Sequence, residues 1–106
     1  MMKEDSSKLV ETLLSSDLKA DLLTLFRKNP GIIDTVEGIS SRLGTTADSL
    51  LSDLKDLTDI GILSTKKVGK LEVVYLNRKR DREVQQIVAV HFQSLKPDEQ
   101  TLLPVG

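Results

Sequence analysis

The feature that most constrains this chain is a change in the apolar period at Gly61. In residues 48–63, "DSLLSDLKDLTDIGIL", three leucines recur with helical spacing before that glycine. After it, two β-rich runs, 62–68 and 71–76, flank a Gly-Lys pair, which is the pattern of a β-hairpin. A helix that ends at a glycine and leads directly into a hairpin predicts a mostly α fold with a small β-hairpin, hence α+β.

Other helices are predicted on both sides of this unit. One covers residues 5–14, and a second begins at Ser16 or Asp17 and ends at "NPG", because proline cannot continue a helix. The apolar face of the second helix is expected to hold Leu18, Leu22, Leu25 and Phe26. After a short β-like step, "IID", a third helix covers 36–43, with Thr35 as its N-cap and Gly44 at its end. A final helix is expected from about Arg80 until just before Pro97.

The order helix, helix, short strand, helix, helix, hairpin, helix is that of a winged helix-turn-helix. It divides the chain into an N-terminal helical arm (1–16), the winged helix-turn-helix domain (17–77), a C-terminal helix (78–96) and a flexible tail (97–106). A chain of 106 residues suits one domain with one modest core.

Residues 17–76 resemble the winged-helix repressors of the ArsR and MarR type. Three stretches carry the resemblance: "DLKADLLTLF", "TVEGISSRLGTTADSLLSDLKDLTDIGIL" and "KKVGKLEVVYL". The resemblance implies that the second stretch is the helix-turn-helix and the third is the wing. It also implies a dimeric transcriptional regulator, with helix 46–60 in the major groove of double-stranded DNA and the wing on phosphates. Two branches of the family hold metals, but this chain has no cysteine and a single histidine, so a metal site is not expected.

The charges on helix 46–60 do not suit a polyanionic partner. Four aspartates, at 48, 53, 56 and 59, accompany Lys55 alone. Three interpretations are open. The helix start reads DNA, with Asp48 accepting from a cytosine amino group; or the helix binds a protein; or the acids serve the helix dipole and solubility. The last explains Asp48 but not Asp56 and Asp59, near the C-terminal end, for which a solvated face is expected.

Charge along the chain is strongly uneven, although the formal net charge is only −1. Residues 34–60 hold six acidic and two basic residues, whereas residues 64–82 hold seven basic and two acidic ones. A basic run beside a wing can clamp phosphates, although such a run is often only a solvated face. The predicted DNA-binding residues are Thr45, Thr46, Asp48, Ser49, Ser52 and Lys55 on the helix, Lys66, Lys67 and Lys70 on the wing, and Arg78 and Lys79 at its base.

The terminal helices carry more apolar surface than one helix pair needs, which predicts a homodimer. The predicted interface residues are Leu9, Val10, Leu13, Leu14, Val84, Ile87, Val88, His91, Phe92 and Leu95. His91 lies within this apolar stripe, where a hydrogen-bonded interior or interface histidine is favoured over a pH or metal switch.

Composition narrows the function classes. The chain has no membrane-length apolar run, and its N-terminus is too charged for a signal peptide, so a cytoplasmic location is expected. It has no glycine-rich phosphate loop, no ligand cluster and no nucleophile with a base at motif spacing. A non-enzyme without cofactors is therefore predicted, and the alternative to a DNA-binding regulator is a winged-helix protein–protein module in a larger assembly.

Overall fold

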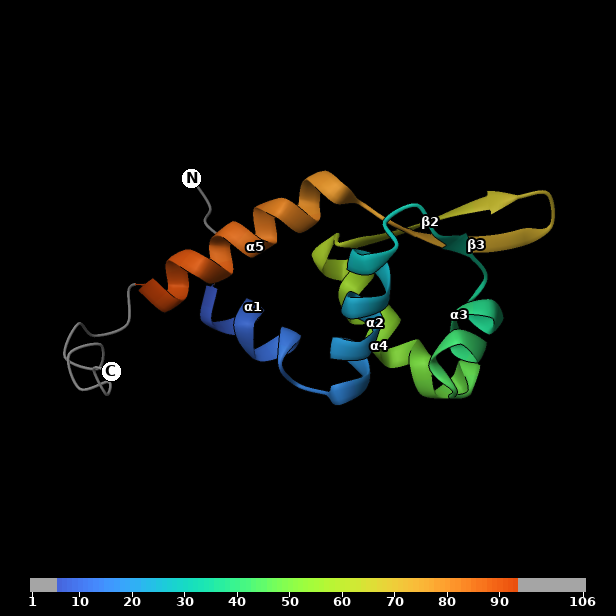
Figure 1. Ribbon diagram of the computed structural model, residues 1–106, viewed down its shortest axis with the longest axis horizontal. Helices are drawn as coiled ribbons and strands as arrows, with labels where there is room; N and C mark the ends of the chain where they lie inside the picture. Colours follow the sequence, from blue (N-terminus) through green and yellow to red (C-terminus); the bar gives the residue numbers. More distant parts are fainter. Residues whose placement is uncertain (1–5, 94–106) are drawn as a thin grey trace.

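A computed structural model describes residues 6–93. Five helices and three strands follow one another in the predicted order (Figure 1). Their bounds are α1 (Ser6–Leu13), α2 (Asp17–Lys28), β1 (Ile33–Asp34), α3 (Val36–Leu43), α4 (Ala47–Ile60), β2 (Leu63–Val68), β3 (Leu71–Leu76) and α5 (Arg78–Gln93). This mostly helical chain with a small antiparallel sheet has the arrangement of a winged helix-turn-helix, as the sequence predicted.

Hydroxyl side chains start the central helices. The hydroxyls of Ser16, Thr35 and Thr46 each accept a hydrogen bond from a backbone N–H in the first turn of α2, α3 and α4. Glycines end two of these helices, because Gly44 and Gly61 adopt the left-handed conformation with φ of 68° and 98°. These local signals were readable from the sequence, and they set the lengths of α3 and α4.

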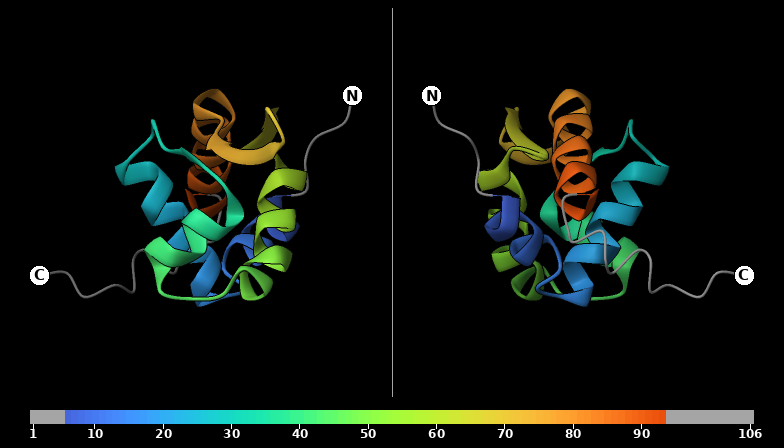
Figure 2. Two further views of the ribbon diagram at one scale, coloured as in Figure 1. Left: turned by 90° about the vertical axis from the view of Figure 1, so that its right-hand side faces the viewer. Right: turned by 90° about the vertical axis from the view of Figure 1, so that its left-hand side faces the viewer.

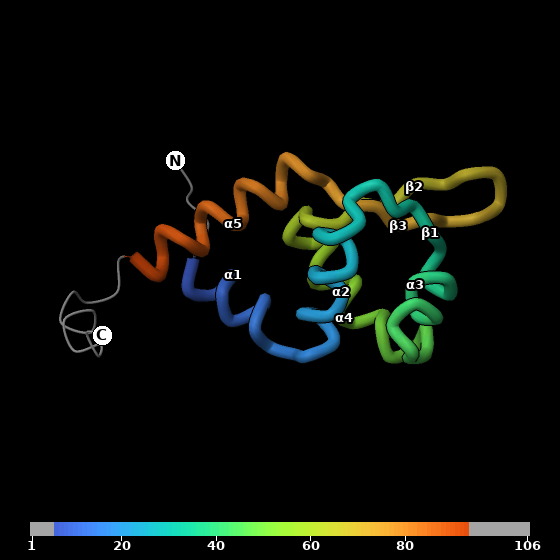
Figure 3. The backbone as a smooth tube through the Cα atoms, viewed as in Figure 1, coloured from blue at the N-terminus to red at the C-terminus, as the bar shows by residue number. Residues whose placement is uncertain are grey.

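The sheet is larger than the predicted hairpin. Its strand order is β1-β3-β2, so the "IID" step pairs with the second hairpin strand, with Ile33 opposite Tyr75 and Asp34 opposite Val74 (Figure 3). The hairpin itself pairs Leu63 with Leu76 at its base and Val68 with Leu71 at its tip. Because β1 leads directly into α3, this pairing fixes the start of α3 against the sheet.

One apolar core joins the helices to the base of the hairpin. Its buried members come from every helix and from both hairpin strands: Leu9, Leu22, Leu23, Phe26, Ile39, Leu50, Leu54, Leu57, Ile62, Leu63, Val74, Leu76 and Val84. Figure 2 shows α2 and α4 on opposite sides of this body, with α5 above them. No helix within residues 6–93 is long and apolar enough to cross a membrane.

Two details of the sequence prediction were wrong. The predicted face of α2 lacked Lys19 and Leu23, which are buried with Leu22 and Phe26, whereas Leu18 and Leu25 are half-buried and pack against the core. The last helix begins two residues earlier than predicted, since the side-chain oxygen of Asn77 accepts from the backbone N–H of Arg80 at 3.0 Å and caps the helix there. The predicted end of that helix, near Pro97, lies outside the described residues.

Two arginine contacts attach α5 to the domain. The guanidinium of Arg27 on α2 donates to both carboxylate oxygens of Asp81, at 2.7 to 3.1 Å, and Asp81 is 4% exposed. Arg80 donates through Nε to the backbone oxygen of Ile60, at the C-terminal end of α4, at 2.8 Å. The start of α5 is therefore held by both α2 and α4.

Leu54 tests the placement of α4. It lies in the core and is 6% exposed. Leu54→Ala should lower the free energy of unfolding by roughly 2–5 kcal/mol, because transfer and cavity terms add. Urea unfolding measures this, and the exposed Leu14→Ala serves as the control. A loss below about half a kcal/mol at Leu54 would contradict this packing.

Candidate nucleic-acid interface

The first turn of α4 presents hydroxyl groups. Thr46, Ser49 and Ser52 are exposed, and Thr45 is half-buried. Thr46 Oγ1 accepts from the backbone N–H of Ser49 at 3.2 Å and shares a hydrogen bond with Ser49 Oγ at 2.8 Å. The cap thus holds two of these hydroxyls in fixed positions, each with further capacity to donate or accept.

Two carboxylates of α4 share one ammonium group that reaches them from inside the protein. The ammonium of Lys19 on α2 lies 2.8 Å from Asp56 Oδ2 and 3.6 Å from Asp53 Oδ1. Ser16 Oγ also donates to Asp53 Oδ2 at 3.1 Å. This corrects the expectation that Asp56 belongs to a solvated face, because its carboxylate, although 41% exposed, pairs with the buried ammonium of Lys19.

Lys19 itself is 1% exposed and fully engaged. Besides Asp56, its ammonium donates to the backbone oxygen of Thr12 at 3.0 Å and to Ser15 Oγ at 2.7 Å. A buried ammonium is tolerated only with such partners. Lys19 therefore joins the end of α1, the start of α2 and the middle of α4.

A third carboxylate is neutralised on the surface. Lys55 donates to Asp59 Oδ2 at 2.9 Å, one turn along α4. The hydrogen bond and the charge of Asp59 raise the pKa of Lys55 above its ordinary value. Asp48 alone among the four aspartates makes no side-chain hydrogen bond or ion pair within residues 6–93. The one aspartate of α4 without a lysine partner in the described part of the chain thus lies in the first turn of the helix.

The wing lysines are exposed but do not form a single row. The ammonium of Lys66 lies 5.2 Å from the centre of the Tyr75 ring, a cation–π distance. Lys67 stands opposite Glu72 in the hairpin register, and Lys70 follows the turn at Gly69. Arg78 and Lys79 are exposed in the first turn of α5, which Asn77 alone separates from the end of β3 at Leu76.

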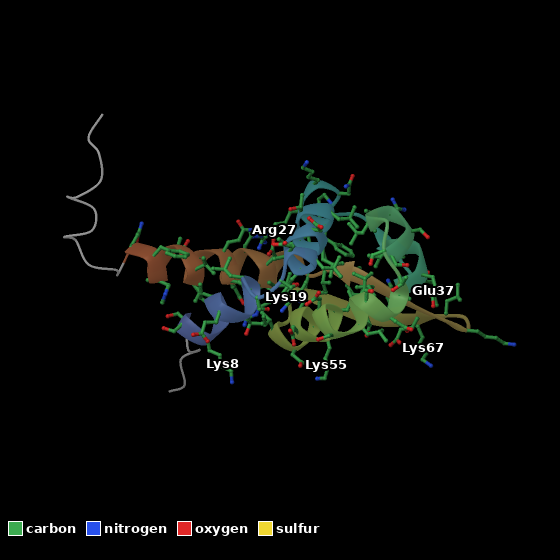
Figure 4. All side chains as sticks on the ribbon, turned by 90° about the horizontal axis from the view of Figure 1, so that it is seen from below. Lys8, Lys19, Arg27, Glu37, Lys55 and Lys67 are labelled. Carbon is green, nitrogen blue, oxygen red and sulfur yellow. The ribbon has the colours of Figure 1, made fainter. Side chains whose placement is uncertain are left out.

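Figure 4 shows that lysines from three elements project from the same edge of the molecule, namely Lys8 of α1, Lys55 of α4 and Lys67 of β2. This edge is the one formed by α4, on the side away from α2. Cations thus accompany α4 along its outer side, from the α1 arm to the wing.

The predicted dimer residues fall into two groups. Leu9, Val10 and Val84 are buried at 8% exposure or less within their own chain, which leaves little of their surface for a partner. The half-buried members are Leu13, Ile87, Val88 and His91. The exposed ones are Leu14 and Phe92, and Val90, which was not predicted, is exposed as well. Leu95 lies outside the described residues. His91 Nδ1 shares a hydrogen bond with Ser6 Oγ at 3.1 Å, as expected for an interior histidine.

Lys19 and Leu51 are the residues that sequence reasoning missed. Lys19 occupies the first position of the stripe 19, 22, 23 and 26, so a charge in a helical apolar repeat was the available signal. Leu51 is 54% exposed on α4, beside Asp48. Its position one residue after a buried leucine gave no sign of a surface role. Within residues 6–93 no three histidine, aspartate or glutamate side chains gather as metal ligands would.

The chain is similar in structure to a possible transcriptional regulator from Methanosarcina mazei Go1. The TM-score is 0.61 at 13% identity, and the match covers 97% of this chain and 92% of that protein. At this identity the likeness shows the shared fold. No family model matches the chain, and no curated protein does.

Lys19→Met tests the buried ion pair. The change leaves Asp53 and Asp56 without their cation. Removing one partner of a fully buried ion pair lowers the free energy of unfolding by roughly 3–5 kcal/mol. Because Asp56 is 41% exposed, we expect a loss of about 2 kcal/mol in urea unfolding. Adding Asp53→Asn and Asp56→Asn should recover most of it. Lys28→Met, exposed on the same helix, is the control, and equal effects at both lysines would refute the role of Lys19.

Proposed function

We propose that this chain is a sequence-specific, DNA-binding transcriptional regulator that acts in the cytoplasm as a homodimer. In this proposal α4 enters the major groove and the β2–β3 wing contacts phosphates. The carrying observation is the hydroxyl-rich first turn of α4, which lies on the edge of the molecule where Lys8, Lys55 and Lys67 project. The similar fold of a possible transcriptional regulator, and the sequence resemblance to the ArsR and MarR type, support the same function.

The helix start would read the bases. Ser49 and Ser52 can contact bases or phosphates, as can the two threonines before them. Asp48 is suited to accept from the amino group of cytosine, so it would select bases rather than add affinity. Affinity would come from the wing lysines through phosphate contacts, whereas Lys55 pairs with Asp59. The proposal is for a binding function with no catalytic step.

The internal ion pairs make this proposal physically reasonable. Four carboxylates on α4 would oppose DNA binding, but Asp53 and Asp56 share Lys19 and Asp59 pairs with Lys55, so two of the four negative charges are compensated. Repulsion from the C-terminal half of α4 is thereby reduced, and Asp48 is the carboxylate left to take part in base selection.

A winged-helix protein–protein module is the second candidate. It is favoured by the charge and exposure at the start of α4, where Asp48 has no cationic partner among residues 6–93 and Leu51 is half exposed. The two candidates differ in their behaviour with DNA. A DNA-binding regulator should hold random-sequence duplex at low salt with strong salt dependence, whereas a protein module should not.

The wing lysines are tested together. The triple variant Lys66→Ala, Lys67→Ala and Lys70→Ala should flatten the plot of log affinity against log salt by about 0.9 for each phosphate that the wing no longer neutralises. Fluorescence anisotropy with a labelled duplex gives this slope. Lys28→Ala, exposed at the C-terminal end of α2, is the matched control and should leave the slope unchanged. An unaltered slope in the triple variant would remove the wing from the DNA site.

The dimer is tested on α5. Val90 and Phe92 are exposed at 51% and 48%, whereas Val88 packs against the core of its own chain. Val90→Asp should therefore give a monomer by light scattering with unchanged helical circular dichroism, because an unpaired charge opposes burial in an interface. DNA affinity should fall, since two linked half-sites become one. Thr24→Asp, at an exposed position of α2, is the control. A wild-type chain that is already monomeric at high micromolar concentration would refute the homodimer.

A further inference from the structure

A hollow of about 360 Å³ lies between the wing and the starts of α3 and α4. Its walls include Glu37 of α3, Asp48 and Leu51 of α4, and Leu71 and Glu72 of β3, with Lys70 at the tip of the wing. Figure 4 shows Glu37 at the end of the molecule from which Lys67 of the wing also projects. The hollow therefore adjoins the first turn of α4 on its wing side.

Two large apolar side chains are left in water at this hollow. Leu51 is 54% exposed and Leu71 is 58% exposed, although they come from different elements. Single exposed leucines are common on proteins, but two that line one hollow offer a shared apolar surface. Covering them would remove apolar area from water, which favours binding of a partner with an apolar side chain.

The charges around the same hollow are mostly negative. Glu37, Asp48 and Glu72 are all exposed, and none of their carboxylates makes a hydrogen bond or ion pair within residues 6–93. Among the described residues, Lys70 is the one cation on the lining. These carboxylates contrast with Asp53, Asp56 and Asp59, which have lysine partners. A phosphate backbone in this hollow would meet three carboxylates against one lysine of the lining, so an anionic ligand does not suit it.

We infer that this hollow binds a protein segment in which an apolar side chain is flanked by lysine or arginine. The apolar side chain would cover Leu51 and Leu71, and the cations would pair with the three carboxylates. Such binding goes beyond the proposed DNA function. Because Asp48 belongs both to the hollow and to the predicted DNA-binding residues, an occupied hollow would exclude DNA from the start of α4. The basic segment would thus release the protein from DNA.

Peptide selection tests the chemistry of this site. Random peptides of about a dozen residues, displayed on phage, are selected against the full chain, and the enriched peptide is then synthesised with a fluorescent label. We expect enrichment of Lys or Arg around an apolar residue. Affinity should fall at least about tenfold with Leu51→Ser and with Glu72→Lys. The controls, Ile33→Ser and Asp21→Lys, change an exposed apolar residue and an exposed acid that do not line the hollow, and they should not alter binding.

Other outcomes overturn the inference. Enrichment of acidic peptides, absence of a consensus, or equal losses in the controls would each do so. Circular dichroism checks the fold of every variant, and Leu71→Ser on the wing replaces Leu51→Ser if the latter unfolds. The synthesised peptide is then added to protein bound to labelled duplex. Displacement supports exclusion of DNA, and a ternary complex overturns it. If the chain binds the peptide but no DNA, the proposed function is refuted and the peptide site in the hollow is not. If the chain binds DNA but no peptide, only this inference is refuted.

Discussion

The ammonium of Lys19 lies where three helices meet, and the position of α4 depends on it. Its partners are the last turn of α1, Ser15 in the connection to α2, and two carboxylates on α4. Hydrophobic packing alone would let α4 slide or rotate against α2 at small cost, because apolar contacts have little directionality. Hydrogen bonds to a buried ammonium restrict both movements, since any displacement would leave a charge without partners. The helix that we propose enters DNA is thus held by directional contacts from within.

The sequence was sufficient for the local part of this structure. Caps such as Thr46 and breaks such as Gly61 act within one helical turn, so their effects follow from neighbouring residues. The pairing of Lys19 with Asp56 joins positions 37 residues apart, and no local pattern reveals which lysine meets which aspartate. The pairing of β1 with β3 was missed for the same reason, because a two-residue strand carries almost no periodic signal. Of the candidate site, the position of α4 and the wing could be predicted, whereas the distribution of charge over α4 required the tertiary structure.

That distribution divides α4 into two parts with different electrostatic character. Toward its C-terminal end Lys19 and Lys55 compensate two of three carboxylate charges, and its first turn joins Glu37 and Glu72 in an acidic hollow that has Lys70 as its one cation among the described residues. A uniformly acidic helix would repel nucleic acid along its whole length, and a uniformly basic one would offer nothing to a cationic peptide. The observed division allows one surface to bind DNA by its hydroxyls and lysines, and a protein by its acids and leucines. Whether the two ligands compete then depends on how they share Asp48.

The strand order β1-β3-β2 has a consequence for the solubility of the protein. β2 is an edge strand, and within the described part of the chain its outer backbone N–H and C=O groups have no neighbouring strand. Such an edge can pair with the edge of another chain and begin aggregation unless charge prevents it. Lys66 and Lys67 lie in the middle of β2, where two strands brought together would place like charges side by side. Cationic residues on this strand therefore keep the sheet from extending between molecules, whatever the wing contacts.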